Sequence, residues 1–536
     1  MLASGCLLTA QAPALAYVAL MAGQVARPLQ GQFNSVPVLH SNQPEEVHGP
    51  GILITTTPGY SYASETGQAL ANPTYTFQGE FAAHIHHKYY PTDRARLGNH
   101  RDRGLLTLGT ILINPSNQPV RIRFQQGAVR NSFEAPYLPN YLLGVKPLGP
   151  RPWNTGPGDA TSVQMLRGKL DAKIPEELVL PPRSRSVIFR TDLPARGIAN
   201  GLLKGRSDGP FQMAVVAAED PQSDQDLIAV LDRRQLAPGR IYLKRIAEIQ
   251  NRSVFSRVGG VAIGDTYTAR LSHDLARGPL HVPLTSTNRH HFGTREVQVN
   301  PLASRMVDSS LDNVGTYGVR FDVELNVNGS GPHELVLSHP TANGRAFTAF
   351  RGSIGIGTRE GYREVHVGMR SGESLSLASL ELLSGGPNQV KVSLVYPADA
   401  TPGHLLSIVP SSQLALLQER ERLLQLARAE AEARAVAAST PPPTLVDPEA
   451  NPPPATPAAA PPAPAATSKP QSQGAKNPAR LPAAPLPLPP MSPLLPPPIL
   501  APPSMIAPPR MNQTLIERYR EAVDAQQQLM NRLMGR

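Results

Sequence analysis

The chain has 536 residues, a formal net charge of +10, 40% apolar residues and 5% aromatic residues. Because a single hydrophobic core stops growing at roughly 250–300 residues, this length excludes a one-domain protein. The positive charge comes mostly from arginines scattered along the chain, without the clustered basic face that nucleic-acid binding needs, so we expect no nucleic-acid partner.

The beginning of the chain resembles a secretory signal peptide. Residues 2–22 are apolar and rich in small side chains, and Ala14-Leu15-Ala16 forms the A-x-A pattern of a cleavage site. No Lys or Arg precedes Arg27, so the usual basic n-region is missing, and a start codon assigned too late would explain this. We expect a signal-peptide-like segment at 1–22, export to the periplasm or outer envelope, and no transmembrane helix in the mature chain. A lipoprotein acylated at Cys6, the one cysteine, and a buried N-terminal helix are the alternatives.

The next segment, residues 23–410, has the alternating pattern of β-strands. In VRFDVELNV, at 319–327, apolar residues alternate with Arg, Asp, Glu and Asn, which places one set on a buried face and the other in water. Asn328-Gly329 then supplies residues that tolerate positive φ, as a tight turn requires. Many such short segments predict an all-β fold, and the length favours two antiparallel β-sandwich-like domains, at 23–238 and 239–410.

One helix is expected within this β-rich segment, shortly before the boundary at 238. The stretch SDQDLIAVLDRRQLAP has helix-forming residues in place of alternation. Ser223 can cap the first turn, and Asp226 is favourable there because of the helix dipole.

The pattern changes again after residue 410. Residues 411–438 contain strong helix formers and no Gly or Pro, and they predict a helix. Residues 439–510 are so rich in Pro and Ala that they cannot bury enough apolar surface to fold, and we expect a disordered, extended linker.

The last segment, 511–536, predicts an amphipathic helix that follows the linker. Its apolar side chains lie near one helical face and include Leu515, Tyr519, Val523 and Met530. We expect this face to dock on an envelope component or protein partner, on another copy, or on its own chain. A frayed tail is the alternative, since a helix of this length is marginal alone.

Three histidines in FAAHIHHKYYPTD are the most notable candidates for chemistry. On a strand, His84 and His86 share a face and His87 points the other way, so two of them could bind one metal ion. A catalytic zinc site usually needs three protein ligands, and a carboxylate such as Asp93 or Asp102 would have to converge with them. We favour half-exposed structural histidines and expect no metal, no cofactor and no catalytic residues.

Two other stretches contain candidate functional residues. Trp153 lies in a loop-like segment with Tyr137 and Tyr141 nearby, and aromatic faces suit sugar rings, although core packing is the commoner role of such residues. GRSDG has the spacing of a nucleophile elbow around Ser207, but a strand-like segment follows it where a helix is required. We interpret GRSDG as a turn.

Several stretches together resemble a known family: VARPLQGQFNSVPVLHSNQPEEV, GILITT, FQGEFAAHIHH, LGTILINPSNQPV, RVGGVAIGD and VSLVYPADATPGHLLSI. The family is a cyanobacterial group of secreted proteins known only as domain-of-unknown-function family 3370, and the resemblance covers about 24–410. It implies an exported protein of the envelope or periplasm and brings no catalytic residues. The C-terminal extension departs from the family.

These observations favour a non-catalytic, exported structural or binding protein with a β-rich body, a proline-rich spacer and a docking helix. A metal-dependent hydrolase acting on wall or extracellular polymer and a carbohydrate-binding module are the alternative functions.

Overall fold

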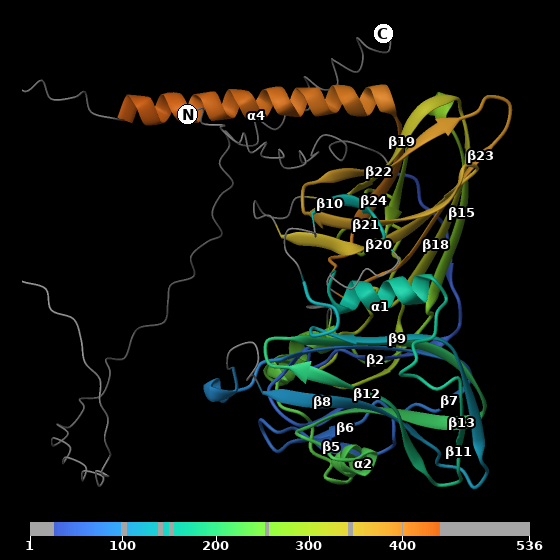
Figure 1. The fold of residues 1–536 in the computed structure, drawn as a ribbon, viewed down its shortest axis with the longest axis vertical. Helices are drawn as coiled ribbons and strands as arrows, with labels where there is room; N and C mark the ends of the chain where they lie inside the picture. The colour runs from blue at the N-terminus through green and yellow to red at the C-terminus, as the bar shows by residue number, and fades with distance from the viewer. Residues whose placement is uncertain are drawn as a thin grey trace, which may run out of the picture. The chain divides into compact units, whose positions relative to one another are not determined.

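The computed structural model describes residues 26–97, 104–137, 143–149, 155–251, 257–340, 347–398 and 400–439. Residues up to Ala429 belong to one compact unit, which holds every sheet, and a second unit begins at Glu430. The first unit is β-rich with few helices, as the alternating sequence predicts (Figure 1). Of the linker predicted at 439–510, only Ser439 is described, as the last residue of a helix; residues 440–510 and the helix predicted at 511–536 lie outside the described residues.

An 11-stranded sheet forms the part of the unit that we call the first lobe. Its strands are β2 (Pro37–Ser41), β3 (Glu46–Val47), β4 (Gly51–Thr55), β7 (Phe77–Tyr89), β8 (Leu105–Ile113), β9 (Val120–Asn131), β11 (Glu177–Leu180), β12 (Arg185–Pro194), β13 (Ile198–Ala218), β14 (Gly259–Ile263) and β17 (Leu302–Arg305). A small hairpin of β5 (Tyr60–Tyr62) and β6 (Ala69–Ala71) lies beside it.

Strand β13 joins the two layers of the first lobe. Its first part pairs with β7 and β9, and its second part, from Gln212, pairs with β8 and β4. The core between these layers is aromatic at its centre, where Phe77, Phe81 and Phe211 pack with ring centroids 4.8–6.4 Å apart. Such edge and stacked contacts add to the free energy of burial that holds the layers together.

The second lobe is a sandwich of a 7-stranded and a 4-stranded sheet. The larger sheet contains β1 (Gln32–Phe33), β10 (Gly144–Pro147), β15 (Thr266–Asp274), β18 (Arg320–Asn328), β20 (Thr348–Thr358), β21 (Gly361–Arg370) and β23 (Asn388–Val395). The smaller sheet contains β16 (Leu280–Leu284), β19 (Gly331–Ser338), β22 (Ser374–Leu382) and β24 (His404–Pro410). The apolar side chains of β18 are all buried in the core of this lobe, which confirms the predicted alternation.

The two lobes exchange strands across the expected boundary at 238. β1 and β10, from the N-terminal half, form the edges of the 7-stranded sheet, whereas β14 and β17, from the C-terminal half, extend the 11-stranded sheet. Most strand pairs are antiparallel, but β15 runs parallel to β18, and β2 and β3 run parallel to β7. The chain therefore crosses between the lobes several times.

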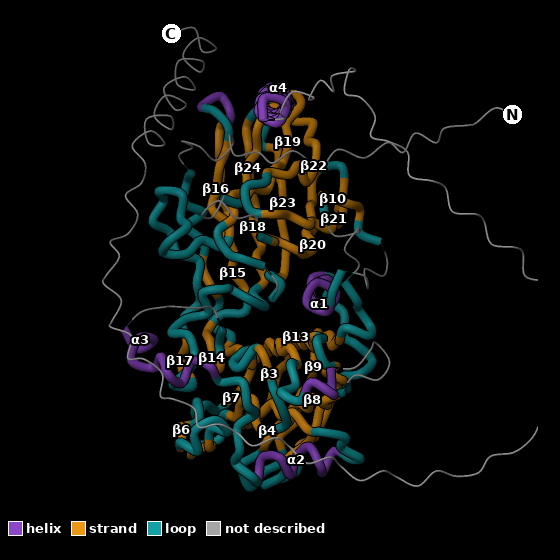
Figure 2. The backbone as a smooth tube through the Cα atoms, turned by 90° about the vertical axis from the view of Figure 1, so that its left-hand side faces the viewer, coloured by secondary structure: helices purple, strands orange, loops and turns teal. Residues whose placement is uncertain are grey.

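Few helices accompany the sheets. They are α1 (Pro157–Leu166), α2 (Asp224–Asp232), α3 (Ile246–Asn251) and α4 (Ser411–Ser439), with short 3-10 turns at Arg94–Leu97, Ile241–Arg245 and Leu275–Arg277. Figure 2 shows α1 between the strand-rich lobes, where it contacts β9 and β13 of the first lobe and β20 and β23 of the second. α2 confirms the helix predicted after Ser223, since the Asp226 carboxylate accepts a hydrogen bond from the Ser223 N–H at 2.8 Å. None of the helices in the described part of the chain is long and apolar enough to cross a membrane.

Two local predictions were wrong. GRSDG is not a turn: it lies inside β13, where Ser207 is buried and the pairing with β7 is irregular between Ser207 and Phe211. The connection after β18 has its positive φ at Gly331 (80°) and not at Asn328 or Gly329. β19 then enters a different sheet from β18, so the two strands do not form a hairpin. In both places tertiary pairing overrides the local turn signal.

Candidate functional site

Strand β7 carries the three histidines that the sequence singled out. His84 and His86 lie on one face, with ring centroids 6.4 Å apart and an angle of 7° between the rings, and His87 lies on the other. This confirms the predicted alternation. The expectation that they are half-exposed is wrong, because their exposed fractions are 1%, 1% and 0%. Tyr317 and Gly318, which shortly precede β18 of the second lobe, lie against His84, whereas His87 contacts Ser41 and Pro44 of the first lobe.

A fourth histidine, His40, joins them from β2 and was not found from the sequence. β2 pairs with β7 in parallel and places His40 directly beside His84. Their Nδ1 atoms are 3.3 Å apart, and both rings are buried. The sequence places Val38 and His40 on the same face of β2. It does not reveal which strand lies next to β2.

His87 has a structural role that its two contacts define. Its Nδ1 lies 2.7 Å from the carbonyl oxygen of Pro44, which can only accept, so Nδ1 carries the proton. Nε2 then accepts from the Ser41 hydroxyl at 2.8 Å. A neutral imidazole with both nitrogens satisfied is a stable arrangement in a buried site.

The N-terminal half of α1 links polar groups of both lobes. Toward the first lobe, the Thr161 hydroxyl accepts from Asn200 Nδ2 at 2.5 Å, and Asn200 Oδ1 lies 3.0 Å from His86 Nδ1. Toward the second lobe, the Asp159 carboxylate accepts from His366 Nδ1 at 3.0 Å and from Ser353 Oγ at 2.9 Å. We call this hydrogen-bonded set, together with His40 and His84, the interlobe layer.

Burial disfavours the charged forms of His40 and His84 in the interlobe layer, and of His87 on the other face of β7. Burial lowers the pKa of His40 to about 3. Burial also lowers the pKa of His84 well below its ordinary value, and His40, His86 and His87 add to this shift. Burial lowers the pKa of His87 to about 3, although the Pro44 carbonyl opposes this change. Neutral, water-excluded rings favour packing over acid–base chemistry at neutral pH.

The carboxylates that a metal centre would need do not join these histidines in the described residues. Asp93 is exposed, and its carboxylate accepts from the N–H of Ala95; Asp102 lies outside the described residues. His290 lies in the second lobe beside Gly403, far along the chain from His84. Among the residues that the structure describes, no group of three or more His, Cys, Asp or Glu could hold a metal ion.

The aromatic residues weighed as a sugar platform are only partly described. Trp153 and Tyr141 lie outside the described residues. The ring of Tyr137 is half-buried and lies against the Arg351 guanidinium, 4.7 Å from its centroid, so one of its faces is already occupied. Tyr362, with an exposed fraction of 60%, is an accessible aromatic residue that the sequence did not single out.

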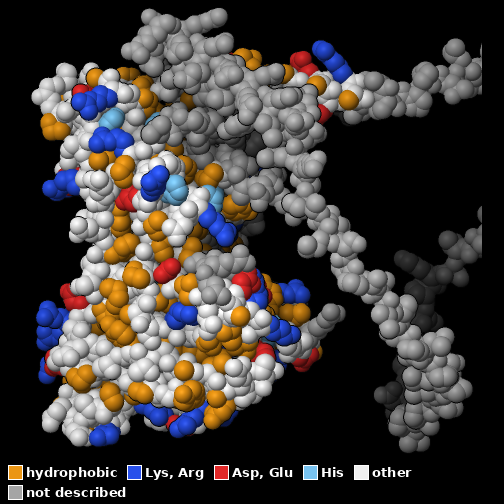
Figure 3. Space-filling model, turned by 180° about the vertical axis from the view of Figure 1, so that it is seen from behind, with side chains coloured by type: hydrophobic (Ala, Val, Ile, Leu, Met, Phe, Trp, Pro, Cys, Tyr) orange, Lys and Arg blue, Asp and Glu red, His pale blue; other side chains and the backbone are white. Residues whose placement is uncertain are grey.

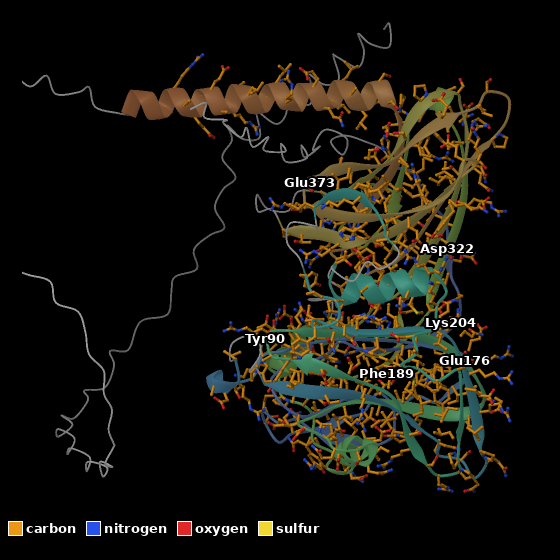
Figure 4. The ribbon with its side chains drawn as sticks, viewed as in Figure 1. Tyr90, Glu176, Phe189, Lys204, Asp322 and Glu373 are labelled. Atoms are coloured by element: carbon orange, nitrogen blue, oxygen red, sulfur yellow. The ribbon has the colours of Figure 1, made fainter. Side chains whose placement is uncertain are left out.

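A cleft of about 390 Å³ opens between the lobes on the same sheet face as the histidines. Figure 4 labels Lys204 of β13 and Asp322 of β18, which belong to its two sides. The charges there pair with near neighbours: Lys204 with Asp265 at 2.9 Å, and Arg320 with Asp322 at 2.7 Å. The first pair ties β13 to the connection between β14 and β15, whereas the second lies within β18, and together they leave little unmatched charge for a ligand.

A larger groove, of about 820 Å³, lies in the second lobe. It runs between the turn that joins β20 to β21, the end of β22 and the start of β23. Leu380, Leu382 and Val390 form its buried apolar floor. Tyr362 and Leu383, with exposed fractions of 60% and 48%, stand at its rim. We call this hollow the second-lobe groove, and its size is within the range of ligand sites.

The surface carries no obvious footprint for nucleic acid on the face drawn in Figure 3. Lys and Arg side chains are dispersed there among neutral and apolar ones. The absence of a nucleic-acid partner stays a prediction.

Comparison with known proteins gives a family and no activity. No curated protein matches the chain. A family model described as a protein of unknown function (DUF3370) matches residues 24–410, with the bounds that the sequence motifs predict. The match ends where β24 ends and leaves α4 and the proline-rich segment outside. The chain therefore belongs to the DUF3370 family of proteins of unknown function.

Proposed function

We propose that this protein is an exported, non-catalytic binding protein of the cell envelope, and that the second-lobe groove is its binding surface. The groove carries this proposal: it has a volume of about 820 Å³ and combines an apolar floor with an exposed aromatic rim. Such a surface suits a ligand that is held by contact and hydrogen bonds.

The interlobe layer supports a non-catalytic role. Its histidines are buried, and where their pKa is shifted it is lowered, so they suit a structural joint between the lobes. Two carboxylates near these histidines are already engaged: Asp159 accepts hydrogen bonds from His366 and Ser353, and Glu45 pairs with Lys88 and Arg257.

Export is proposed from the sequence of the first 22 residues, which has an apolar run and the Ala14-Leu15-Ala16 pattern. The proline-rich segment would then serve as a spacer between the β-rich body and the terminal amphipathic segment.

Fractionation of cells that carry the epitope-tagged full chain tests the location. We expect the mature protein in the periplasm or envelope, with its N-terminus at a new residue after the first 22. Full-length protein confined to the cytosol would overturn the proposal. Deleting 511–536 should release the protein from the envelope pellet, and unchanged retention would contradict a docking role for that segment.

Metal analysis tests the alternative of a metal-dependent hydrolase. We expect no stoichiometric zinc, iron or manganese in the purified full chain. A stoichiometric metal that the His84→Ala/His86→Ala double substitution removes, while the circular dichroism spectrum is retained, would favour the hydrolase.

A further inference from the structure

The second-lobe groove is bordered by a strand edge. β22 is the last strand of the 4-stranded sheet and pairs with β19 along its whole length, from Leu382↔Gly331 to Ser374↔Ser338. In the described residues no strand pairs with its other edge. The end of β22, from Ser379 to Leu382, lines the groove.

A second, shorter edge faces the same groove from β23. This strand pairs with β18 over its full length, but it pairs with β20 only where Lys391–Ser393 meets Gly355–Gly357. Residues 388–390 do not pair with β20, because β20 turns into β21 at 359–360 before it reaches them. Asn388, Gln389 and Val390 line the groove at this place.

Strand edges determine what kind of ligand matches the groove. Their main-chain N–H and C=O groups repeat at the strand spacing and offer hydrogen bonds to another extended chain. The apolar floor of Leu380, Leu382 and Val390 lies below and can accept side chains from every second position of such a chain. The groove is lined by two basic and two acidic residues, so it favours a ligand without strong net charge; they are Arg359, Lys391, Glu360 and Glu381.

Tyr362 is held in place at this rim. It pairs with Gly357 across the hairpin, and its hydroxyl donates to Glu364 at 3.2 Å. A Cβ at Gly355 would lie 2.4 Å from the Tyr362 hydroxyl oxygen, so the ring lies over the bare backbone of β20. A fixed aromatic side chain is a good anchor, because it loses little conformational entropy on binding.

We propose that the second-lobe groove binds an extended, largely uncharged polypeptide segment of a partner protein by strand addition to the free edge of β22. This inference rests on the proposed function and names the ligand class of the same surface. The side chains of the segment at alternate positions would contact the apolar floor, and Tyr362 and Leu383 would cover one end. A glycan is the competing ligand, but sugar sites rely on aromatic platforms and have no need of strand edges.

The test starts from a phage-displayed random dodecapeptide library selected on the purified full chain. Enriched peptides are synthesised with a fluorescent label, and their affinity is measured by polarisation. N-methylation of alternate backbone nitrogens in one register should weaken binding by about tenfold or more, because it removes main-chain donors, whereas the other register should tolerate it.

Matched variants locate the peptide on the protein. Tyr362→Ala and Leu383→Lys should each weaken binding by about tenfold or more. Tyr60→Ala and Val179→Lys are the controls, since these first-lobe residues are exposed to the same degree, 59% and 48%. The control variants should leave peptide affinity unchanged.

Three results would overturn the inference: no enriched peptide, binding that is indifferent to N-methylation in either register, or a glycan-array ligand whose binding Tyr362→Ala abolishes. The proposed function fails separately. Cytosolic full-length protein would refute export without affecting peptide binding in vitro, whereas an exported, envelope-retained protein that selects no peptide refutes only strand addition.

Discussion

Acid should destabilise this protein through its buried histidines. The folded-state pKa of His40 and His87 is about 3 for each, against an ordinary value of 6.5. Below pH 6.5 the unfolded chain binds protons that the folded rings do not. The free energy of unfolding therefore falls as the pH falls, until the pH approaches the folded-state pKa. The stability from these groups is therefore fully present above 6.5 and is lost in the window between about 6.5 and 3.

The magnitude follows from proton linkage. Each histidine contributes a slope of about 1.4 kcal/mol per pH unit, so each costs about 2 kcal/mol at pH 5. His40 and His87 together then remove about 4 kcal/mol, a large share of the roughly 5–15 kcal/mol that stabilises a typical protein. His84 and His404, whose pKa is lowered well below the ordinary value by burial, act in the same direction.

The measurement is guanidinium unfolding of the full chain, followed by circular dichroism at a series of pH values from 8 down to 5. His87→Gln should lower stability at pH 8 but flatten the pH slope by about 1.4 kcal/mol per unit. Val261→Ala, a non-titrating change at a fully buried site, is the control and should lower stability equally at every pH. A free energy of unfolding that stays level from pH 8 to 5 would refute the neutral-histidine argument.

Three further predictions concern packing and the ligand surface. Gly318→Ala should destabilise the protein by more than the roughly 1–2 kcal/mol of a left-handed backbone, because its φ is 75° and its Cβ would lie 3.0 Å from the Cβ of His84. Gly331, with φ of 80° and open space around it, is the control, because Gly331→Ala loses only the stability that the backbone conformation costs. Equal losses of stability for the two variants in thermal unfolding would contradict close contact between the lobes. Asp308→Ala should lower the free energy of unfolding by about 3–5 kcal/mol, since it leaves the buried Arg240 guanidinium without its carboxylate. Asp232→Ala, at the exposed pair with Arg185, should lower it by less than about 1 kcal/mol. Similar losses for the two variants in denaturant titration would contradict this account. Leu383→Lys should leave the thermal midpoint within about 1–2 °C of the unsubstituted protein, because Leu383 is a rim residue, and a large fall would show that the groove is part of the core.

The sequence determined the local structure wherever one face of an element is buried. Alternation from Val319 to Val327 placed β18, the capping residues Ser223 and Asp226 placed α2, and the run of helix formers after Pro410 placed α4. The family motifs gave bounds that the family match confirms. These features depend on neighbouring residues along the chain, so they can be read in one dimension.

Tertiary structure decided the rest, because it depends on which strands meet. Nothing in the sequence pairs β2 with β7, so His40 could not be placed beside His84, and the three histidines expected to be half-exposed are buried, two on one face of β7 and His87 on the other. GRSDG has the composition of a turn, yet Gly205, Arg206 and Ser207 pair on both sides and keep the stretch within β13. The second-lobe groove exists because β22 and β23 belong to different sheets and leave their edges open. Pairing between strands far apart in the chain is set by packing and not by the local sequence pattern.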